Sequence, residues 1–330
     1  MNKMILVKHN NEGNLKAYFY FALEEYILEH VLKDDEAYFF TWKIKGVVIG
    51  KNQVLENEVN MEYLKDNDIT LFRRPTGGGT IYADESNTMY TMITKKTTNF
   101  SFKPYLELVI KAMEKLGLKI EFSGRNDLLF EGKKISGVAF LQNKYGVLIH
   151  GTYMYDVDIE TMIRSITPNN EKLISKGIDS VRSRVVNLKP HLNGLSLDDL
   201  VKHLENEITF EEYILSDEEI KIVQKMAEKY ESDEWRFLKQ PSYTKNISKR
   251  ISGGMFNATL ELNHGVIQDI KITGDFFDLY PIEIIEDKLK NINYTKEEVT
   301  KVLDGINIED MILDIKKQEF LDFLLSGIVN

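Results

Sequence analysis

The sequence predicts an α+β fold in which helices flank a mixed or mainly antiparallel sheet. Strand-like runs of β-branched and aromatic residues follow one another at residues 127–130, 135–141 and 147–154, with no helical segment between them. Consecutive strands joined by short turns pair antiparallel. Two other segments, at about residues 19–31 and 103–116, have apolar residues at helical spacing, so each can pack one face against the sheet.

Both helical segments are amphipathic. The first has its apolar residues on one face, and we expect Glu24, Glu25 and Glu29 on the opposite, polar face. The second begins near Pro104, which suits a first helical turn, and ends at Gly117, which suits a C-terminal stop.

Turns and polar stretches divide the rest of the chain. We expect hairpin turns at residues 131–133 and 263–265. The irregular, polar stretch at about residues 239–250 is typical of a connector. We therefore expect a larger domain at residues 1–245 and a smaller α+β domain at residues 246–330. The other expected strands are residues 38–42, 46–49, 69–73, 88–93, 257–262 and 266–273.

Composition limits the class of protein. Of the 330 residues, 43% are hydrophobic, so the chain can bury a core without disulfides or structural metals. It has no cysteine, which excludes disulfides and cysteine nucleophiles and fits the reducing cytoplasm. No segment has the roughly 18 apolar residues of a membrane span, and no signal peptide is visible. The net charge of −10 argues against a general nucleic-acid binder, because phosphate binding needs a basic face.

A basic segment leads into a glycine loop. Arg73 and Arg74 are followed by three glycines at residues 77–79 and by a strand-like run from residue 80. Without Cβ atoms the backbone N–H groups can approach an anion closely, and the guanidiniums add charge and bidentate hydrogen bonds. The spacing is not that of a Walker A motif. We interpret the loop as an anion-binding site rather than a plain surface turn.

Three further segments carry polar residues. Lys134 directly precedes an apolar strand, so we expect it to be held next to the loop, whereas Lys133 is a solvated turn residue. His150 lies within a strand, where a single histidine is more often structural than catalytic. The six histidines are scattered without ligand spacing, which argues against a zinc or di-iron site. Residues 176–188 add a basic run.

Together these segments resemble the lipoate–protein ligase A family. The matching motifs are residues 73–84, residues 124–127, residues 134–137, residues 150–152 and residues 176–188. Because the motifs are specific and weaker similarity continues through the rest of the chain, the resemblance covers nearly the whole sequence.

Two positions depart from the family pattern. Ala83 stands where many members have histidine, so any role of that histidine is missing here. Tyr20 occupies a position that is often asparagine. Both departures put local substrate contacts in question.

The resemblance implies a fold and a set of site residues. Residues 1–245 would be a catalytic domain related to biotin ligases and class II synthetases, followed by an α+β accessory domain. Lys134 would be the catalytic residue and contact both lipoate and the α-phosphate. The other residues implied are Arg74, Gly79, Thr80, Ile81 and Tyr82 for ATP and the adenylate, Gly77, Gly78, His150, Gly151 and Thr152 for the lipoyl tunnel, and Asn126 and Asp127 near the phosphate, the acceptor lysine or, for Asp127, Mg²⁺.

The resemblance also implies an activity. Lipoate, and octanoate as well, would react with ATP to give an acyl adenylate and pyrophosphate, and the acyl group would then pass to a lysine of an acceptor protein. The implied acceptors are lipoyl domains of 2-oxoacid dehydrogenase E2 subunits and the glycine cleavage H protein. Mg²⁺ would accompany ATP, with no tightly bound metal cluster, in a cytoplasmic monomer.

Three alternatives are open but less favoured. An octanoyl or lipoyl transferase of the same fold commonly uses an active-site cysteine, and this chain has none. A biotin ligase would normally have a Gly-Arg-Gly-Arg type of loop in place of the three glycines. A lipoyl-binding module without enzymatic activity would not need Lys134 together with Arg74.

Overall fold

The computed structural model describes residues 3–10, 15–96, 101, 103–123, 126–166, 183–238 and 242–328. The chain divides into two compact units. The first takes in the residues up to Lys51 and those from Glu58 to Arg236, and the second takes in residues 52–57 and those from Phe237 onward.

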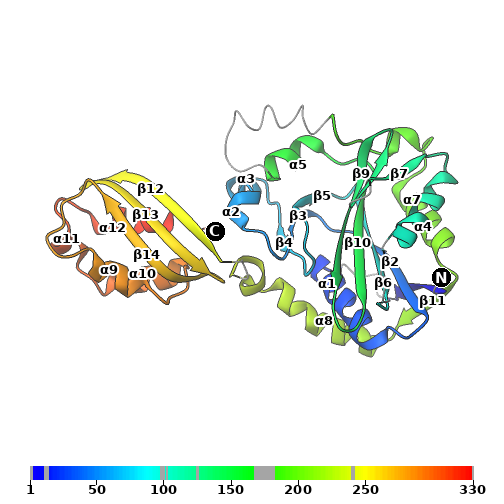
Figure 1. Ribbon diagram of the computed structural model, residues 1–330, viewed down its shortest axis with the longest axis horizontal. Coiled ribbons are helices and arrows are strands. Elements are labelled where there is room, and N and C mark those ends of the chain that lie inside the picture. Colours follow the sequence, from blue (N-terminus) through cyan, green and yellow to red (C-terminus); the bar gives the residue numbers. More distant parts are fainter. Residues whose placement is uncertain are drawn as a thin grey trace. The chain divides into compact units, whose positions relative to one another are not determined.

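A mixed sheet forms the centre of the first unit (Figure 1). Within the described residues it has eight strands in the order β11-β1-β2-β6-β10-β9-β8-β7. β1 pairs parallel with β2 and β11, whereas the other neighbours pair antiparallel, so the expected mixed sheet is confirmed. The strands are β1 (Lys3–His9), β2 (Glu36–Trp42), β6 (Asn87–Thr94), β7 (Ile120–Phe122), β8 (Asp127–Phe130), β9 (Lys133–Gln142), β10 (Val147–Met154) and β11 (Glu211–Leu215).

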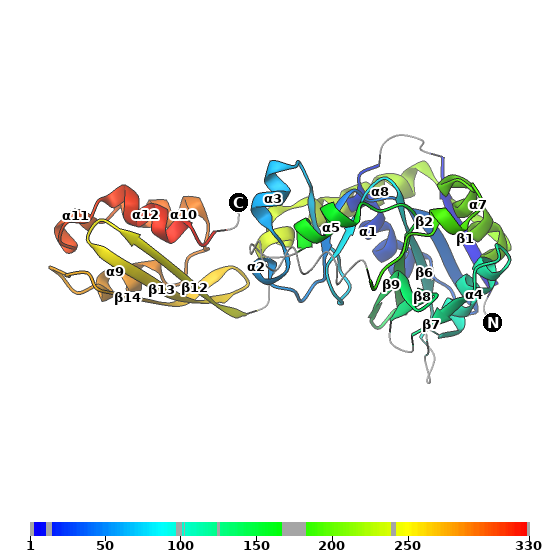
Figure 2. The same ribbon diagram turned by 90° about the horizontal axis from the view of Figure 1, so that it is seen from above.

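Helices cover both faces of this sheet (Figure 2). Side chains alternate between the faces, so Phe40 of β2 lies in one apolar core and Phe39 in the other. The core around Phe40 includes α1 (Ala17–Tyr26), its π-helical continuation η1 (Ile27–Val31) and α8 (Asp217–Glu231). The core around Phe39 includes α4 (Lys103–Glu114) and α7 (Leu197–Ile208).

A smaller sheet carries the glycine loop. β3 (Gly46–Ile49) pairs parallel with β4 (Leu71–Arg73) and antiparallel with β5 (Ile81–Ala83), and the loop joins β4 to β5. This sheet is anchored because Val48 and Phe72 lie in the same apolar core as Phe40. The remaining short elements are α2 (Leu55–Glu58), α3 (Met61–Asp66), α5 (Ile159–Ile166), η2 (Lys189–His191) and η3 (Glu234–Leu238). Of these, most of α2 and the end of η3 are grouped with the second unit.

The second unit is an antiparallel meander with its own apolar core, to which helices contribute. The expected hairpin turn is confirmed, since His264 and Gly265 have φ values of 50° and 79°, as a two-residue turn of this kind requires. The elements are β12 (Tyr243–Ile251), β13 (Gly254–Asn263), β14 (Val266–Gly274), α9 (Glu283–Leu289), α10 (Lys296–Asp304), α11 (Ile308–Met311) and α12 (Lys317–Leu325).

The prediction of a connector at residues 239–250 is wrong for most of this stretch. β12 starts at Tyr243 and pairs with β13 along its whole length. The sequence does not show the apolar alternation of a strand, because Ile247 is buried whereas most other residues of β12 are exposed and polar or charged. We therefore place the start of the smaller domain before Tyr243.

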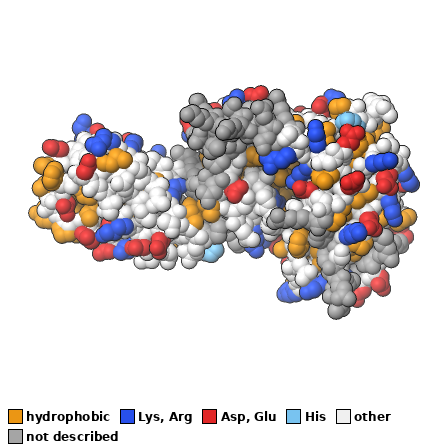
Figure 3. Space-filling model, turned by 45° about the horizontal axis from the view of Figure 1, so that its top comes forward, with side chains coloured by type: hydrophobic (Ala, Val, Ile, Leu, Met, Phe, Trp, Pro, Cys, Tyr) orange, Lys and Arg blue, Asp and Glu red, His pale blue; other side chains and the backbone are white. Residues whose placement is uncertain are grey.

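On the face seen in Figure 3, Lys and Arg side chains are interspersed with Asp and Glu rather than gathered in one basic patch. Among the described residues, no helix combines the length and the apolarity needed to cross a bilayer.

Candidate active site

Two adjoining cavities lie in the first unit. The first has a volume of about 80 Å³ and the second about 380 Å³. Both are lined by Thr80, Ile81, Lys134, Gly137 and Thr152, which therefore form the boundary between them. The segment after the glycine loop, β9 and β10 meet at this boundary.

Strand β10 arranges the two cavities in line. His150, Thr152 and Met154 alternate along the strand and so point to the same face. His150 and Thr152 line the first cavity, and Thr152 and Met154 line the second. Each step of two residues advances about 7 Å along a strand. The site thus runs from His150, past the boundary at Thr152, to Met154.

The glycine loop, residues 77–79, packs closely against the segment after β3. Gly78 has a φ of 89°, a conformation that L side chains rarely adopt. A Cβ on Gly50 would collide with the carbonyl oxygen of Gly78, so this approach requires glycine at position 50. The N–H of Lys51 donates to the carbonyl oxygen of Thr76 at 2.8 Å, which fastens the two segments together.

Arg74 holds the loop in shape. Its Nη1 donates to the carbonyl oxygen of Val48 at 3.1 Å, and its Nη2 donates to those of Gly77 and Gly79 at 2.7 Å each. Burial lowers the pKa of Arg74 to about 10, so the guanidinium is still charged at neutral pH. Arg74 also lines the first cavity. It therefore adds positive charge to the cavity wall while it fixes the loop.

Arg73 has a structural place. Its guanidinium donates to the carbonyl oxygens of Gly50, Lys51 and Arg236 at 3.0–3.3 Å. The side chain has no exposed surface. Arg73 lines neither cavity and its guanidinium already donates to backbone carbonyl oxygens, so the interpretation of both arginines as anion ligands is wrong for Arg73.

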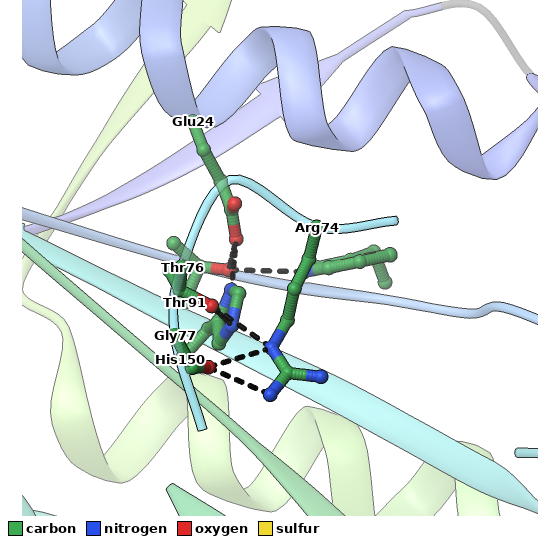
Figure 4. Close-up of polar contacts among 7 residues, drawn as sticks. Glu24, Arg74, Thr76, Gly77, Thr91 and His150 are labelled. Atoms are coloured by element: carbon green, nitrogen blue, oxygen red, sulfur yellow. Dashed lines mark hydrogen bonds and ion pairs between the residues drawn. The ribbon is translucent and has the colours of Figure 1, made fainter. Parts of the chain in front are cut away.

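A buried network links Arg74 to helix α1 (Figure 4). Arg74 Nε donates to Thr76 Oγ1 at 2.9 Å, and Thr76 Oγ1 lies 2.8 Å from His150 Nε2. His150 Nδ1 lies 3.0 Å from Glu24 Oε1, which also accepts from Thr91 Oγ1 at 2.7 Å. Because a carboxylate only accepts, His150 donates from Nδ1 to Glu24, and in the neutral imidazole Nε2 then accepts from the Thr76 hydroxyl. The network thus fixes the tautomer and the orientation of His150 at the wall of the first cavity.

The expectation that Glu24 lies on a polar helix face is wrong. Its side chain has no exposed surface, whereas Glu25 and Glu29 are half-buried. Large apolar residues stand three positions before it, at Phe21, and four positions after it, at Leu28, and both are buried. Residues at these spacings share a helix face. This spacing is the sequence signal that identifies Glu24 as buried.

A β-bulge aims Lys134 at the site. Leu128 pairs with Ser136 and Leu129 pairs with Lys134, so Ile135 is an extra residue in β9. In a regular strand Lys134 and Ser136 would point to the same face. Here Leu128 and Ser136 face the core, since Leu128 packs there, whereas Leu129 and Lys134 line the second cavity. The extra residue therefore lets Lys134 reach the site although Ser136 is buried.

Lys134 is held on the site side by its neighbours. Its Nζ lies 2.8 Å from Asp127 Oδ1, and the two side chains are 37% and 30% exposed. A Cβ on Gly137 would lie 3.0 Å from this Nζ, so glycine leaves the room that the ammonium occupies. Lys133 is exposed at the hairpin turn. The structure thus separates the two lysines as the sequence indicated.

Other predicted residues lie at the same walls. Asn126 and Gly151 line the first cavity. Asn126 Nδ2 donates to the carbonyl oxygen of Val138 at 3.3 Å. Tyr82 lines the second cavity, and burial raises the pKa of its hydroxyl to about 12, so it is protonated at neutral pH.

The two departures from the family pattern have different surroundings. Ala83 is fully buried in the same apolar core as Phe40 and lines neither of the two cavities. Tyr20 stacks on Trp42, with ring centroids 5.3 Å apart. Trp42 Nε1 in turn donates to Thr91 Oγ1 at 2.9 Å, so Tyr20 adjoins the network of Glu24.

Sequence reasoning missed several residues of the cavity walls. Asn87 and Met89 lie at the cavity walls because β6 pairs with β10, and the local sequence does not indicate this pairing. Of the predicted basic segments, residues 124–125 and 176–182 lie outside the described residues. The other lining residues that were not assigned are Gly137, Val138 and Ala139 in the first cavity, and Leu129, Met154, Met162, Ile166, Arg184 and Val185 in the second.

Comparisons with known proteins all point to the same family. A model of the lipoyl protein ligase A/B catalytic domain matches residues 16–209, and one of the bacterial lipoate protein ligase C-terminus matches residues 240–324. Lipoate-protein ligase LplJ of Bacillus subtilis is 33% identical, over 92% of this chain and 95% of its own. A lipoate–protein ligase of Streptococcus pyogenes is 32% identical, over 92% and 94%.

Solved structures share the fold. The bi-partite lipoate protein ligase of Thermoplasma acidophilum has a TM-score of 0.64 and 26% identity, over 72% of this chain and 96% of that one. Plasmodium falciparum LipL1 in complex with lipoate has a TM-score of 0.61 and 21% identity, over 99% of both. A lipoate-protein ligase A bound with ATP has a TM-score of 0.59 and 22% identity, over 71% and 98%. From its family matches and close relatives, this chain belongs to the lipoate–protein ligase family.

Proposed function

We propose that this ligase activates lipoate with ATP to form lipoyl adenylate and then transfers the lipoyl group to a lysine of an acceptor protein. The observation that carries the proposal is that Lys134 lines both cavities. We assign the first cavity to the carboxyl end of the acyl substrate and the second to the nucleotide. The two reacting groups would then meet beside one fixed ammonium. Relatives solved with lipoate and with ATP support the choice of these two substrates.

In the first step a carboxylate oxygen of lipoate attacks the α-phosphorus of ATP. The bond from this phosphorus to the bridging oxygen breaks, and pyrophosphate leaves with the electron pair. Lys134 donates hydrogen bonds to the oxygens on which negative charge develops. Arg74, Gly78 and Gly79 line the first cavity and so bring positive charge and loop backbone to the same site. The resulting anhydride is readily hydrolysed, so the site has to keep it from water.

Asp127 is the residue that would hold Mg²⁺. Among the described residues no group of three or more His, Cys, Asp or Glu is placed to bind a metal ion. Mg²⁺ in nucleotide sites needs only one or two carboxylates, because phosphate oxygens and water complete its shell. Asp127 lines the second cavity next to Lys134 and offers such a carboxylate. The ion would supply charge neutralisation on the phosphates.

In the second step the neutral ε-amine of an acceptor lysine attacks the acyl carbon. The bond from this carbon to the phosphate oxygen breaks, AMP leaves, and the amine releases one proton. We propose lipoyl domains of E2 subunits and the glycine cleavage H protein as acceptors. The structural analysis of the Thermoplasma ligase also covers its E2 lipoyl domain, which supports the first of these. We further propose that octanoate is also a substrate and that the enzyme acts in the cytoplasm as a monomer.

Exchange of labelled pyrophosphate into ATP tests the proposal. The exchange should require lipoate, because only the adenylate-forming step run backwards returns the label. A lipoyl domain should then gain one lipoyl group in the presence of lipoate and ATP, as measured by its mass. Folded enzyme that shows neither lipoate-dependent exchange nor modification would exclude the adenylate mechanism.

A further inference from the structure

The first unit has a third cavity, of about 220 Å³, which the proposed reaction does not use. It lies where the end of β1 meets helix α1, and its apolar walls are formed by Val7, Leu23, Phe40 and Ile214. Tyr20 also lines it. Such walls suit an apolar ligand or an apolar part of one.

Helix α1 links the third cavity with the first. Tyr20 and Glu24 are four residues apart, so they lie on the same face of the helix, about 5.4 Å from each other along its axis. Tyr20 lines the third cavity, whereas Glu24 accepts from His150 at the wall of the first (Figure 4). The two cavities are therefore neighbours, one helical turn apart.

Tyr20 and Trp42 form the layer between these two cavities. Their rings are stacked, with centroids 5.3 Å apart and planes at 13°. Trp42 Nε1 donates to Thr91 Oγ1, which donates to Glu24 at 2.7 Å, so the Trp42 ring adjoins the network behind the first cavity. The Tyr20 hydroxyl lies 3.4 Å from Nε2 of His9, which lines the third cavity. The Tyr20 ring is thus held in place on both sides.

The acyl substrate has to reach this layer, because the first cavity is too small for it. A cavity of about 150 Å³ holds one benzene molecule, whereas the first cavity is about 80 Å³. Lipoate is larger than benzene, so only its carboxyl end fits there. With the carboxyl group beside Lys134, the chain points along β10 toward His150. Its far end then meets the stacked rings of Tyr20 and Trp42.

We propose that Tyr20 closes the far end of the acyl site and so sets the longest acyl chain that this ligase accepts. The chains of lipoate and octanoate end before the ring, whereas a longer chain needs the third cavity, which the ring blocks. Tyr20 is one of the two positions at which the chain departs from its family pattern, so this limit belongs to this chain. The inference rests on the proposed function, because it uses the first cavity as the acyl site.

Straight-chain acids test the limit in the unmodified enzyme. The measured quantity is kcat/KM for octanoate, decanoate and dodecanoate in the exchange of pyrophosphate into ATP. We expect dodecanoate to be about 100-fold less efficient than octanoate, because its extra methylenes would have to enter a packed wall. In an open apolar site each methylene would instead improve binding by about fourfold. Wild-type enzyme that uses dodecanoate as well as octanoate would overturn the inference.

Variants of Tyr20 connect the limit to this ring. Tyr20→Ala joins the two cavities and should raise kcat/KM for dodecanoate by about 10- to 100-fold, with a loss of less than about tenfold for octanoate. Tyr20→Phe keeps the stacked ring and removes only the hydroxyl, so it should keep the wild-type limit. A Tyr20→Ala enzyme that still rejects dodecanoate, or a Tyr20→Phe enzyme that accepts it, would contradict the role of the ring.

Tyr26→Ala is the matched control. It also removes a buried ring from α1, but Tyr26 does not line the third cavity, and its hydroxyl donates to Glu219 at 3.1 Å. This variant should unfold at a lower denaturant concentration and still reject dodecanoate. If it accepts dodecanoate as well as Tyr20→Ala does, general loosening of the helix explains the gain and the inference fails.

A crystal structure of Tyr20→Ala with dodecanoate locates the chain. Its terminal methylenes should lie between Leu23 and Phe40 in the third cavity, and a chain end placed elsewhere would overturn the inference. Wild-type enzyme without lipoate-dependent exchange would contradict the proposed function instead. Calorimetric binding of octanoate and dodecanoate to both enzymes would then test Tyr20 directly. If Tyr20→Ala fails to fold, Tyr20→Leu and the wild-type acid series give the same decision.

Discussion

Lys133 and Lys134 are neighbours in sequence with different surroundings. Lys134 faces both cavities and pairs with Asp127, whereas Lys133 is exposed at a turn. We predict that Lys134→Ala lowers the rate of adenylate formation about 100- to 1,000-fold, because it removes a positioned charge from the transition state. Stability should change little, since the side chain is about one-third exposed. Single-turnover formation of lipoyl adenylate measures the effect.

Lys133→Ala is the matched control. It has the same chemistry and lies one residue away, but its side chain is solvated, so the rate should stay close to wild type. Equal losses in the two variants would mean that the reacting phosphate lies elsewhere.

Gly78 combines a left-handed backbone with a crowded position. Its φ is 89°, and an added Cβ would lie 3.0 Å from Arg74 Nη2. We predict that Gly78→Val displaces the guanidinium, abolishes most adenylate formation and lowers the free energy of unfolding by about 1–3 kcal/mol. Denaturant unfolding and the exchange assay measure the two effects.

The adjacent glycine provides a control for stability. A Cβ on Gly79 meets no heavy atom within 4 Å, so Gly79→Ala should unfold at nearly the wild-type denaturant concentration. A Gly78→Val enzyme that binds ATP and lipoate normally would show that the loop does not need its close packing.

At the level of elements, the bulge in β9 and the glycine that follows act together. The bulge turns Lys134 toward the site, and Gly137 leaves space for its ammonium. We predict that Gly137→Ala slows adenylate formation about 100-fold, because a shift of about 1 Å in a catalytic group is enough for this loss. The backbone at this position is not left-handed, and the crowding atoms belong to a flexible side chain, so stability should change by less than about 1 kcal/mol.

A slower rate without a loss of stability would show that Gly137→Ala acts through the position of Lys134. A crystal structure or NMR spectrum of Gly137→Ala should show Lys134 moved while the strands keep their pairing. Full activity with an unmoved Lys134 would mean that the ammonium adapts to the extra methyl group.

The elements differ in how visible they are in the sequence. β8, β9 and β10 contain strand-like apolar segments, and a two-residue turn, in which Glu131 and Gly132 have φ values of 51° and 75°, joins β8 to β9. Their order could therefore be predicted. β12 has a single buried residue among exposed polar ones, and its strand character depends on pairing with β13. Local pattern therefore cannot identify it.

The site was predictable where its residues are consecutive in sequence. The glycine loop, Lys134 and the strand from His150 to Thr152 carry their signal locally. Asn87 enters the site only through the register of β6 against β10, which is a long-range pairing. The role of Arg74 in holding the glycine loop could not be predicted, because the sequence shows its charge but not the carbonyl oxygens to which it donates.

At the level of the whole molecule, the apolar cores are separate. The core of the second unit is formed by residues from 243 to 328, with Phe256, Phe320 and Phe323 in contact at its centre. The residues that line the two cavities all belong to the first unit. A unit with its own core can fold alone. A division after residue 245 would cut β12, so a fair test divides the chain after residue 238.

We predict that residues 239–330, produced alone, fold and unfold cooperatively, as measured by near-ultraviolet circular dichroism during heating. Phe256→Ala should abolish the transition, since removing a fully buried phenylalanine costs about 3–5 kcal/mol, much of the stability of a small domain. Residues 1–238 keep both cavities and should transfer the lipoyl group from preformed lipoyl adenylate to a lipoyl domain. A disordered C-terminal fragment, or a folded N-terminal fragment unable to use the adenylate, would mean that the two units depend on each other for folding or for chemistry.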